Sequence, residues 1–253
     1  MYFDTHTHLD DERFDDDRDT VVQKMRDARV SLAVNIGSDM KTSRKSIEIA
    51  KAYDGIYAAV GVHPHAAEEM TDEDITALAQ MAKGPKVVAI GEIGLDYYYD
   101  NSPRELQKKW FQRQIELAKE LDLPYVVHDR DAHADCMEII KKSGYFRGVM
   151  HCYSGSCEMA RELLELGFYI SFAGPVTFKN GRKAKEAAIY VPMERLLIET
   201  DSPYLTPEPY RGQRNDSSHV QYVAKEIAAL KGLTIEETAR ITRENGKCFF
   251  GID

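Results

Sequence analysis

Histidine and acidic residues recur at the ends of short apolar segments along this 253-residue sequence. Imidazole nitrogens and carboxylate oxygens are ligands for zinc, manganese, magnesium and nickel, and these residue types do not choose between the four metals. Four imidazoles and two carboxylates suffice to bind two divalent cations, with one carboxylate shared. The residues that predict such a metal site are His6, His8, Glu92, His128, His151 and Asp201.

His6 and His8 are two positions apart on a predicted strand, so their side chains point to the same side. A hydrogen-bonded pair of strand-end histidines would show the same spacing. His128 and His151 each end an apolar segment, where a buried imidazole without a partner would be costly. Recurrence at several strand ends, rather than any one histidine, favours metal binding.

Eight apolar segments are predicted to form strands. Most are rich in Val and Ile rather than alternating, which is typical of parallel strands buried on both faces. The segments lie near Met1–Thr5, Leu32–Ile36, Ile56–Val62, Lys86–Ile90, Pro124–Val127, Gly148–Met150, Phe168–Ser171 and Arg195–Glu199.

Helical patterns separate the strands. Ser102 before Pro103, with Glu105 following, predicts a helix start with a serine N-cap, and Thr234 with Glu237 predicts a second capping box. Strands that alternate with helices indicate a parallel sheet. Eight such units in about 250 residues predict an α/β fold, a (β/α)8 TIM barrel, as a single domain over residues 1–253. The carboxyl ends of the strands then share one rim, where the six residues would converge.

Six segments resemble the signatures of the TatD-type metal-dependent deoxyribonuclease family. The resemblance runs from residue 2 to the Asn245-Gly246 segment. The segments are Asp4-Thr5-His6-Thr7-His8-Leu9, Gly61-Val62-His63-Pro64-His65, Gly91-Glu92-Ile93-Gly94-Leu95-Asp96-Tyr97, Leu123-Pro124-Tyr125-Val126-Val127-His128, His151-Cys152-Tyr153-Ser154-Gly155 and Glu199-Thr200-Asp201-Ser202-Pro203-Tyr204-Leu205.

The resemblance implies a barrel related to the amidohydrolases. It places His6, His8, Glu92 and Asp201 around one metal, and Glu92, His128 and His151 around a second, with Glu92 shared. The sequence departs from the family at Asp129, where the family often has serine. A carboxylate at this position near the mouth would disfavour a phosphate.

A phosphodiester resists hydrolysis because its negative charge repels hydroxide and the alkoxide leaves badly. Two divalent cations would activate a water and stabilise the departing oxygen. We expect Asp201 to be both metal ligand and proton acceptor, and Glu92 to act with it as a catalytic residue. His63 is not needed as a metal ligand, because six ligands are already predicted. We expect it to contact the phosphate or to protonate the leaving group; the alternative is a structural hydrogen bond.

Basic and aromatic side chains in the predicted loops are candidates for substrate binding. Arg130, Arg211 and Arg214 could bind phosphates, although a solvated charged rim gives the same pattern. Bases of a single strand could stack on Tyr153, Tyr204 or the run Tyr97–Tyr99, and packing under the loops would explain some of these tyrosines equally well. We expect one stacking platform rather than five.

Composition narrows the classes of protein. The net charge of −9 argues against coating nucleic acid by bulk electrostatics, yet it permits an enzyme with a local cationic site. No apolar stretch reaches eighteen residues, so no membrane span is expected, and the N-terminus lacks the pattern of a signal peptide. The four cysteines show no CxxC spacing and no density typical of a secreted domain, so reduced thiols in the cytoplasm are expected. A monomer is the default expectation.

The leading hypothesis is therefore a cytoplasmic deoxyribonuclease or exonuclease, with single-stranded DNA as substrate and RNA as a further one. The alternative is an acyl or amide hydrolase on the same two-metal site, such as a D-aminoacyl-tRNA deacylase, because paired cations polarise a carbonyl as readily as a phosphoryl oxygen. A binding protein that has lost catalysis ranks low, since all six predicted ligands are present.

Overall fold

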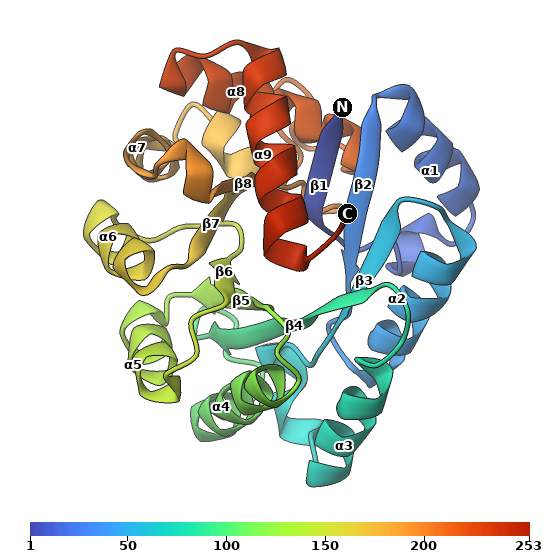
Figure 1. The fold of residues 1–253 in the computed structure, drawn as a ribbon, viewed down its shortest axis with the longest axis vertical. Coiled ribbons are helices and arrows are strands. Elements are labelled where there is room, and N and C mark those ends of the chain that lie inside the picture. Colours follow the sequence, from blue (N-terminus) through green and yellow to red (C-terminus); the bar gives the residue numbers. More distant parts are fainter. The chain divides into compact units, whose positions relative to one another are not determined.

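The computed structural model describes residues 1–253, and strands alternate with helices along the chain (Figure 1). The strand order in the sheet follows the sequence, as predicted for a (β/α)8 barrel. The strands are β1 (Tyr2–Thr7), β2 (Val30–Ile36), β3 (Ile56–Val60), β4 (Val87–Asp96), β5 (Tyr125–Arg130), β6 (Gly148–Met150), β7 (Tyr169–Phe172) and β8 (Leu196–Ile198). All eight predicted strands are confirmed.

The helices occupy the segments between strands, and two of them end the chain. They are α1 (Arg18–Asp27), α2 (Met40–Ala52), α3 (Asp72–Met81), α4 (Arg104–Glu120), α5 (His133–Ser143), α6 (Cys157–Leu166), α7 (Arg182–Tyr190), α8 (Val220–Lys231) and α9 (Ile235–Phe250). No helix is both long enough and apolar enough to cross a lipid bilayer.

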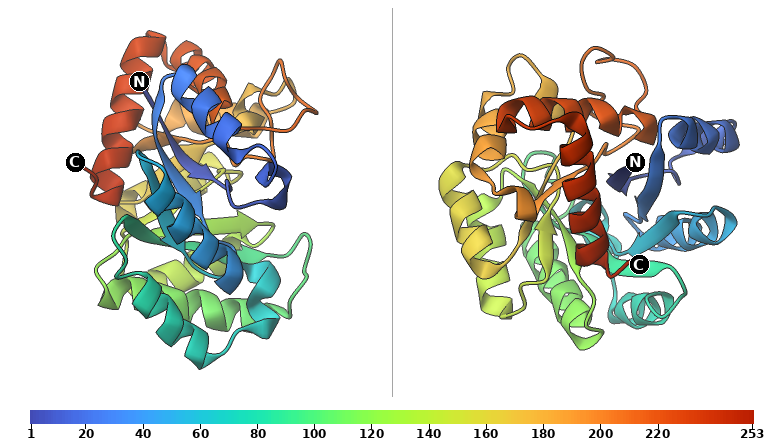
Figure 2. Two further views of the ribbon diagram at one scale, coloured as in Figure 1. Left: turned by 90° about the vertical axis from the view of Figure 1, so that its right-hand side faces the viewer. Right: turned by 45° about the horizontal axis from the view of Figure 1, so that its top comes forward.

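The chain forms two compact units, and the first comprises residues 1–34 and 151–253. In it, β7 pairs with β8 in parallel, with Ile170 opposite Leu196. The amide of Asp201 donates to the carbonyl of His6 at 2.9 Å, so the chain beyond β8 runs beside β1. The last strand thus neighbours the first, which is the closure that a β/α barrel requires. Helix α9 packs along β1 and β8, as the views in Figures 1 and 2 show.

The second unit comprises residues 35–150, and it contains β3 to β6 as neighbouring parallel strands. Helix α4 packs against β4, and α5 packs against both β4 and β5. All ten residues of β4 are buried, as expected for a central strand covered on both faces. At Gly94, opposite His128, a Cβ would lie 1.9 Å from the His128 carbonyl oxygen. Glycine is therefore required where β4 and β5 approach each other.

Two predicted helix starts have different outcomes. Thr234 and Glu237 form the predicted capping box of α9, which ends at Gly251 in the left-handed conformation. The predicted serine cap of α4 is wrong. Helix α4 begins at Arg104 after Pro103, and the Ser102 hydroxyl instead donates to the His65 carbonyl at 3.0 Å. The hydroxyl is used to fix the loop after β3 and is not available to the helix.

Candidate metal centre

Three ligand atoms from the ends of β1 and β8 face one another in the first unit. Nε2 of His6 and Nε2 of His8 lie 3.2 Å apart. Oδ1 of Asp201 lies 3.7 Å from the His6 nitrogen and 3.4 Å from the His8 nitrogen. Two ligands on a tetrahedral zinc ion, with bonds near 2.0–2.1 Å, are separated by about 3.4 Å. These three side chains therefore fit a divalent cation by both chemistry and spacing.

The backbone at Asp201 turns its side chain toward the histidines. Asp201 has a φ of 54°, the left-handed conformation that is uncommon for residues other than glycine. Its amide bond to the His6 carbonyl and the bond from the Tyr204 amide to its own carbonyl hold this turn. Burial raises the pKa of Asp201, but the contact with His8 and the charges of the neighbouring histidines outweigh it, so the pKa lies below its ordinary value. Asp201 is therefore a carboxylate at neutral pH.

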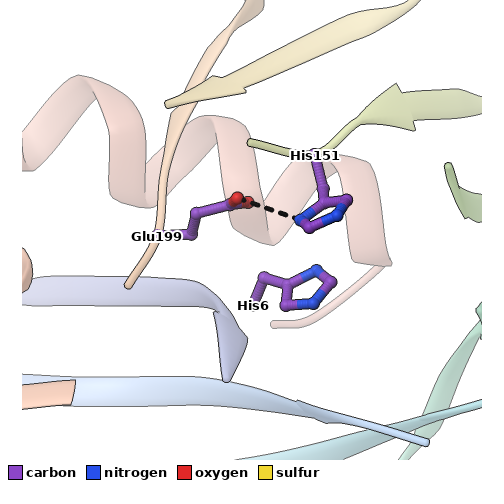
Figure 3. A group of neighbouring side chains, drawn as sticks. All are labelled: His6, His151 and Glu199. Carbon is purple, nitrogen blue, oxygen red and sulfur yellow. Dashed lines mark hydrogen bonds and ion pairs between the residues drawn. The ribbon is translucent and has the colours of Figure 1, made fainter. Parts of the chain in front are cut away.

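His151 joins this cluster together with an acidic residue that the sequence analysis did not assign. The imidazole rings of His6 and His151 stack at 4.1 Å with an angle of 15°, and Figure 3 shows them with the carboxylate of Glu199 directed at His151. Oε1 of Glu199 lies 3.2 Å from Nδ1 of His151 and accepts a hydrogen bond from the Cys152 amide at 2.7 Å. Glu199 is buried, so its contact fixes the orientation of the His151 ring.

Glu92 and His128 lie together in the second unit. Oε1 of Glu92 is 2.8 Å from Nδ1 of His128, while Nε2 of the same ring is 3.1 Å from Oδ2 of Asp96. Burial raises the pKa of Asp96. Its hydrogen bonds with His128 and with the Tyr99 amide lower the pKa by more, so it lies well below its ordinary value. A carboxylate that accepts the Nε2 proton leaves the lone pair of Nδ1 for a cation. Glu92 lies within β4 rather than after it, because the strand continues past the predicted end at Ile90.

His63 and His65 flank the same group. Nε2 of His63 is 3.9 Å from Oε1 of Glu92, and the rings of His63 and His128 are 4.3 Å apart. Nδ1 of His63 accepts a hydrogen bond from the His65 amide, so the proton of the neutral ring resides on Nε2. Burial and the charge of His128 lower the pKa of His63 well below its ordinary value. His63 is thus a neutral donor. His65 contacts Oδ2 of Asp96 at 2.9 Å.

The predicted substrate residues of the first unit differ in their surroundings. Tyr204 is 48% exposed, its ring is 6.3 Å from that of His8, and the guanidinium of Arg13 lies over it at 4.3 Å. Arg214 is held by Asp17 and by a backbone carbonyl. Tyr153 is buried, and its hydroxyl donates to a carbonyl at 2.6 Å. Tyr153 therefore belongs to the packing below the loop.

Two basic predicted residues remain at the surface without an ion pair. The guanidinium of Arg211 lies over the ring of Phe178 at 4.2 Å, and Arg130 ends β5. Asp129, which was expected to disfavour a phosphate, has a buried carboxylate that contacts Nδ1 of His133 at 2.7 Å and accepts from the Ala132 amide. The carboxylate is engaged by these two contacts at the start of α5.

Asp96 and Glu199 are the residues of this region for which the sequence predicted no role. A signal was present, because each lies two to four positions from a predicted functional residue on the same strand end. Buried carboxylates need partners, and the histidines are the partners within reach. Spacing alone could not distinguish a residue that binds a cation from one that orients a ligand.

Known proteins are similar to this chain over nearly its whole length. The family model described as TatD related DNase matches residues 3–251. The chain is 49% identical to the uncharacterized metal-dependent hydrolase YabD of Bacillus subtilis over 100% of both sequences. It is 34% identical to a Citrobacter koseri protein named 3'-5' ssDNA/RNA exonuclease TatD, over 99% of both. The crystal structure of YJJV, a TatD homolog from Escherichia coli, matches 100% of this chain and 98% of its own, with a TM-score of 0.94 and 29% identity.

Proposed function

Because the chain belongs to the family of TatD-related DNases, we propose that it hydrolyses phosphodiester bonds in single-stranded nucleic acid with the help of two divalent cations. Membership of the family makes it a metal-dependent hydrolase. The observation that carries the proposal is the triangle of His6, His8 and Asp201, whose ligand atoms match the spacing around a small cation. The name of the Citrobacter relative, 3'-5' ssDNA/RNA exonuclease TatD, supports nucleic acid as the substrate.

The residues that would hold the cations are those predicted from the sequence. His6, His8 and Asp201 form one donor group, and Glu92 with His128 forms another. We retain His151 as a ligand, oriented by Glu199. Bound divalent cations would polarise the phosphoryl oxygen and stabilise negative charge as the ester bond breaks.

Asp201 and His63 are the residues that we assign to proton transfer and to hydrogen bonding. Asp201 is ionised and its side chain is 13% exposed, so it can accept the proton of the attacking water. His63 presents an Nε2–H group beside Glu92, so it donates a hydrogen bond to a phosphate oxygen or to the leaving oxygen. A neutral His63 can donate this hydrogen bond without adding a positive charge beside the neighbouring histidines.

In the first unit, two exposed side chains would contact the substrate. Tyr204 presents a ring near His8 on which a base can stack. Arg211 carries a cation without a carboxylate partner and can bind a flanking phosphate. Arg214 would act indirectly, because it binds the backbone carbonyl of Arg13, the residue that lies over the Tyr204 ring.

The test is hydrolysis of end-labelled single-stranded DNA, single-stranded RNA and duplex DNA by purified protein supplied with Mg²⁺, Mn²⁺, Zn²⁺ or Ni²⁺. We expect the single strands to be shortened with at least one metal and to remain intact with a chelator. Glu92→Ala should abolish cleavage, whereas Glu165→Ala, which removes an exposed carboxylate on α6, should not. Intact single strands with every metal would refute the proposal.

A further inference from the structure

Two neighbouring tyrosines in the loop after β4 are exposed to solvent although their rings are large and aromatic. Tyr98 is 59% exposed and Tyr99 is 55% exposed. Their rings meet edge to face, 5.0 Å apart at 87°. Neighbouring exposed aromatic side chains are unusual on a free surface and are typical of a surface that receives a ligand.

A cation completes this group. The guanidinium of Arg130 lies 4.0 Å from the centre of the Tyr98 ring and 4.7 Å from that of Tyr99. Arg130 is exposed and forms no ion pair, whereas Arg104 nearby is paired with Asp100. Its charge is therefore available to a phosphate while its planar face rests on the rings.

The loop that carries the tyrosines is fixed by buried hydrogen bonds. Oδ1 of Asp96, which is fully buried, accepts from the amides of Tyr98 and Tyr99 at 3.0 and 2.8 Å. The amide of Tyr97 donates to the carbonyl of Arg130 at 2.9 Å, so the end of β5 is tied to the same loop. The backbone that carries the rings is thus fixed before a ligand arrives, which lowers the entropic cost of binding.

The same carboxylate links this surface to the candidate metal ligands. Oδ2 of Asp96 contacts Nε2 of both His128 and His65. The ring of Tyr99 lies 5.4 Å from that of His65. The tyrosine loop and the candidate ligand His128 are therefore joined through one buried side chain.

We propose that Tyr98, Tyr99 and Arg130 form a stacking subsite for an unpaired nucleobase and its adjoining phosphate. Aromatic faces bind any base, because every base has a π-face, and the arginine contributes a cation–π contact and a phosphate contact. A base within a duplex keeps both faces covered, so the subsite selects single strands. This inference rests on the proposed nuclease function and specifies how that function takes its substrate.

The test measures binding of a labelled single-stranded DNA by fluorescence anisotropy in the presence of a chelator, so that no cleavage occurs. The strand is also supplied as a series of substrates, each of which lacks the base at one position, and this position differs from substrate to substrate. For the unmodified protein, loss of the base at one of these positions should weaken binding roughly 5- to 150-fold, the range that follows from about 1–3 kcal/mol per stacked base. The double variant Tyr98→Leu, Tyr99→Leu should bind the intact strand more weakly by a similar factor and should be insensitive to the missing base.

Tyr190→Leu is the matched control, because Tyr190 is 45% exposed on α7 and has no aromatic or cationic partner. It should bind like the unmodified protein. If the unmodified protein cleaves DNA but the double variant binds as tightly and keeps its sensitivity to the missing base, the subsite is overturned and the nuclease function stands. If the unmodified protein neither binds nor cleaves nucleic acid, both proposals are overturned.

Discussion

Asp96 contacts Nε2 of His128 at 3.1 Å, on the opposite edge of the imidazole ring from Glu92. A carboxylate in this position fixes both the tautomer and the orientation of a histidine that binds a metal. Asp96 is therefore a positioning residue. It also accepts hydrogen bonds from the amides of Tyr98 and Tyr99 in the adjoining loop, so one buried side chain contacts both a proposed metal ligand and the proposed base subsite.

Replacing Asp96 with asparagine should weaken metal binding. An amide can donate to Nε2 and so favour the tautomer with its proton on Nδ1, the nitrogen that faces Glu92. We expect the affinity for one of the two cations to fall by roughly 10- to 100-fold. Competition with a chromophoric chelator measures this. Asp100→Asn, which disrupts only a surface pair with Arg104, is the control, and equal affinities for both variants would contradict the assigned role.

The substitution Asp201→Asn should reduce turnover more than metal binding. An amide retains an oxygen for the cation but cannot accept a proton from water. We expect kcat at saturating metal to fall by about 10²- to 10⁴-fold, the usual contribution of a general base. Rapid-quench kinetics, with metal content determined on the same sample, separates the two effects. Full activity would show that the proton goes elsewhere.

Gly94→Ala should disrupt the structure around His128. The new Cβ would lie 1.9 Å from the His128 carbonyl oxygen, and φ at this position is 148°. Gly144→Ala, at the left-handed end of α5 with nothing within 4 Å, provides the comparison. We expect Gly144→Ala to cost about 1–2 kcal/mol of unfolding free energy and Gly94→Ala distinctly more. Denaturant unfolding of the two proteins measures this, and equal losses would mean that β4 and β5 can separate without penalty.

The pair between Asp11 and Arg13 should make stability depend on acid pH. Hydrogen bonds from Arg13 lower the pKa of Asp11 from 3.8 to about 2. A carboxyl whose pKa is depressed in the folded state stabilises the protein above its unfolded pKa, and this contribution is lost as the pH falls from about 4 to about 2. Because the pair is partly exposed, we expect less than about 1 kcal/mol.

The measurement is the difference in unfolding free energy between the unmodified protein and Asp11→Asn as a function of pH. The difference should be constant above about pH 4 and should shrink toward pH 2. A difference that does not change across this range would show that the folded pKa of Asp11 is not depressed.

The sequence predicted the eight strands well because buried parallel strands are continuous apolar segments. The predicted end of β4, at Ile90, is too early. Glycines such as Gly91 and Gly94 usually interrupt strands, so the strand was expected to stop before them. In the structure these glycines let β4 approach Val126 and His128 closely, so the strand continues to Asp96. A contact between strands cannot be read from one strand alone.

The candidate ligands could be predicted from the sequence because metal binding requires particular residue types at strand ends. The contacts that orient these ligands could not be predicted. Asp96 and Glu199 are acidic residues like any ligand, and only the position of their oxygens against His128 and His151 identifies them as orienting groups. Similarly, Tyr153 and Tyr204 are alike in sequence, yet one is buried and the other is 48% exposed.

The central claim is that these strand-end side chains bind two divalent cations, and anomalous diffraction from crystals grown with Mn²⁺ or Zn²⁺ tests it most directly. We predict two strong peaks per chain, with His6, His8, Glu92, His128, His151 and Asp201 as the protein ligands. Peaks bound to other residues, or no peak near His6 and His8 at saturating metal, would contradict the account.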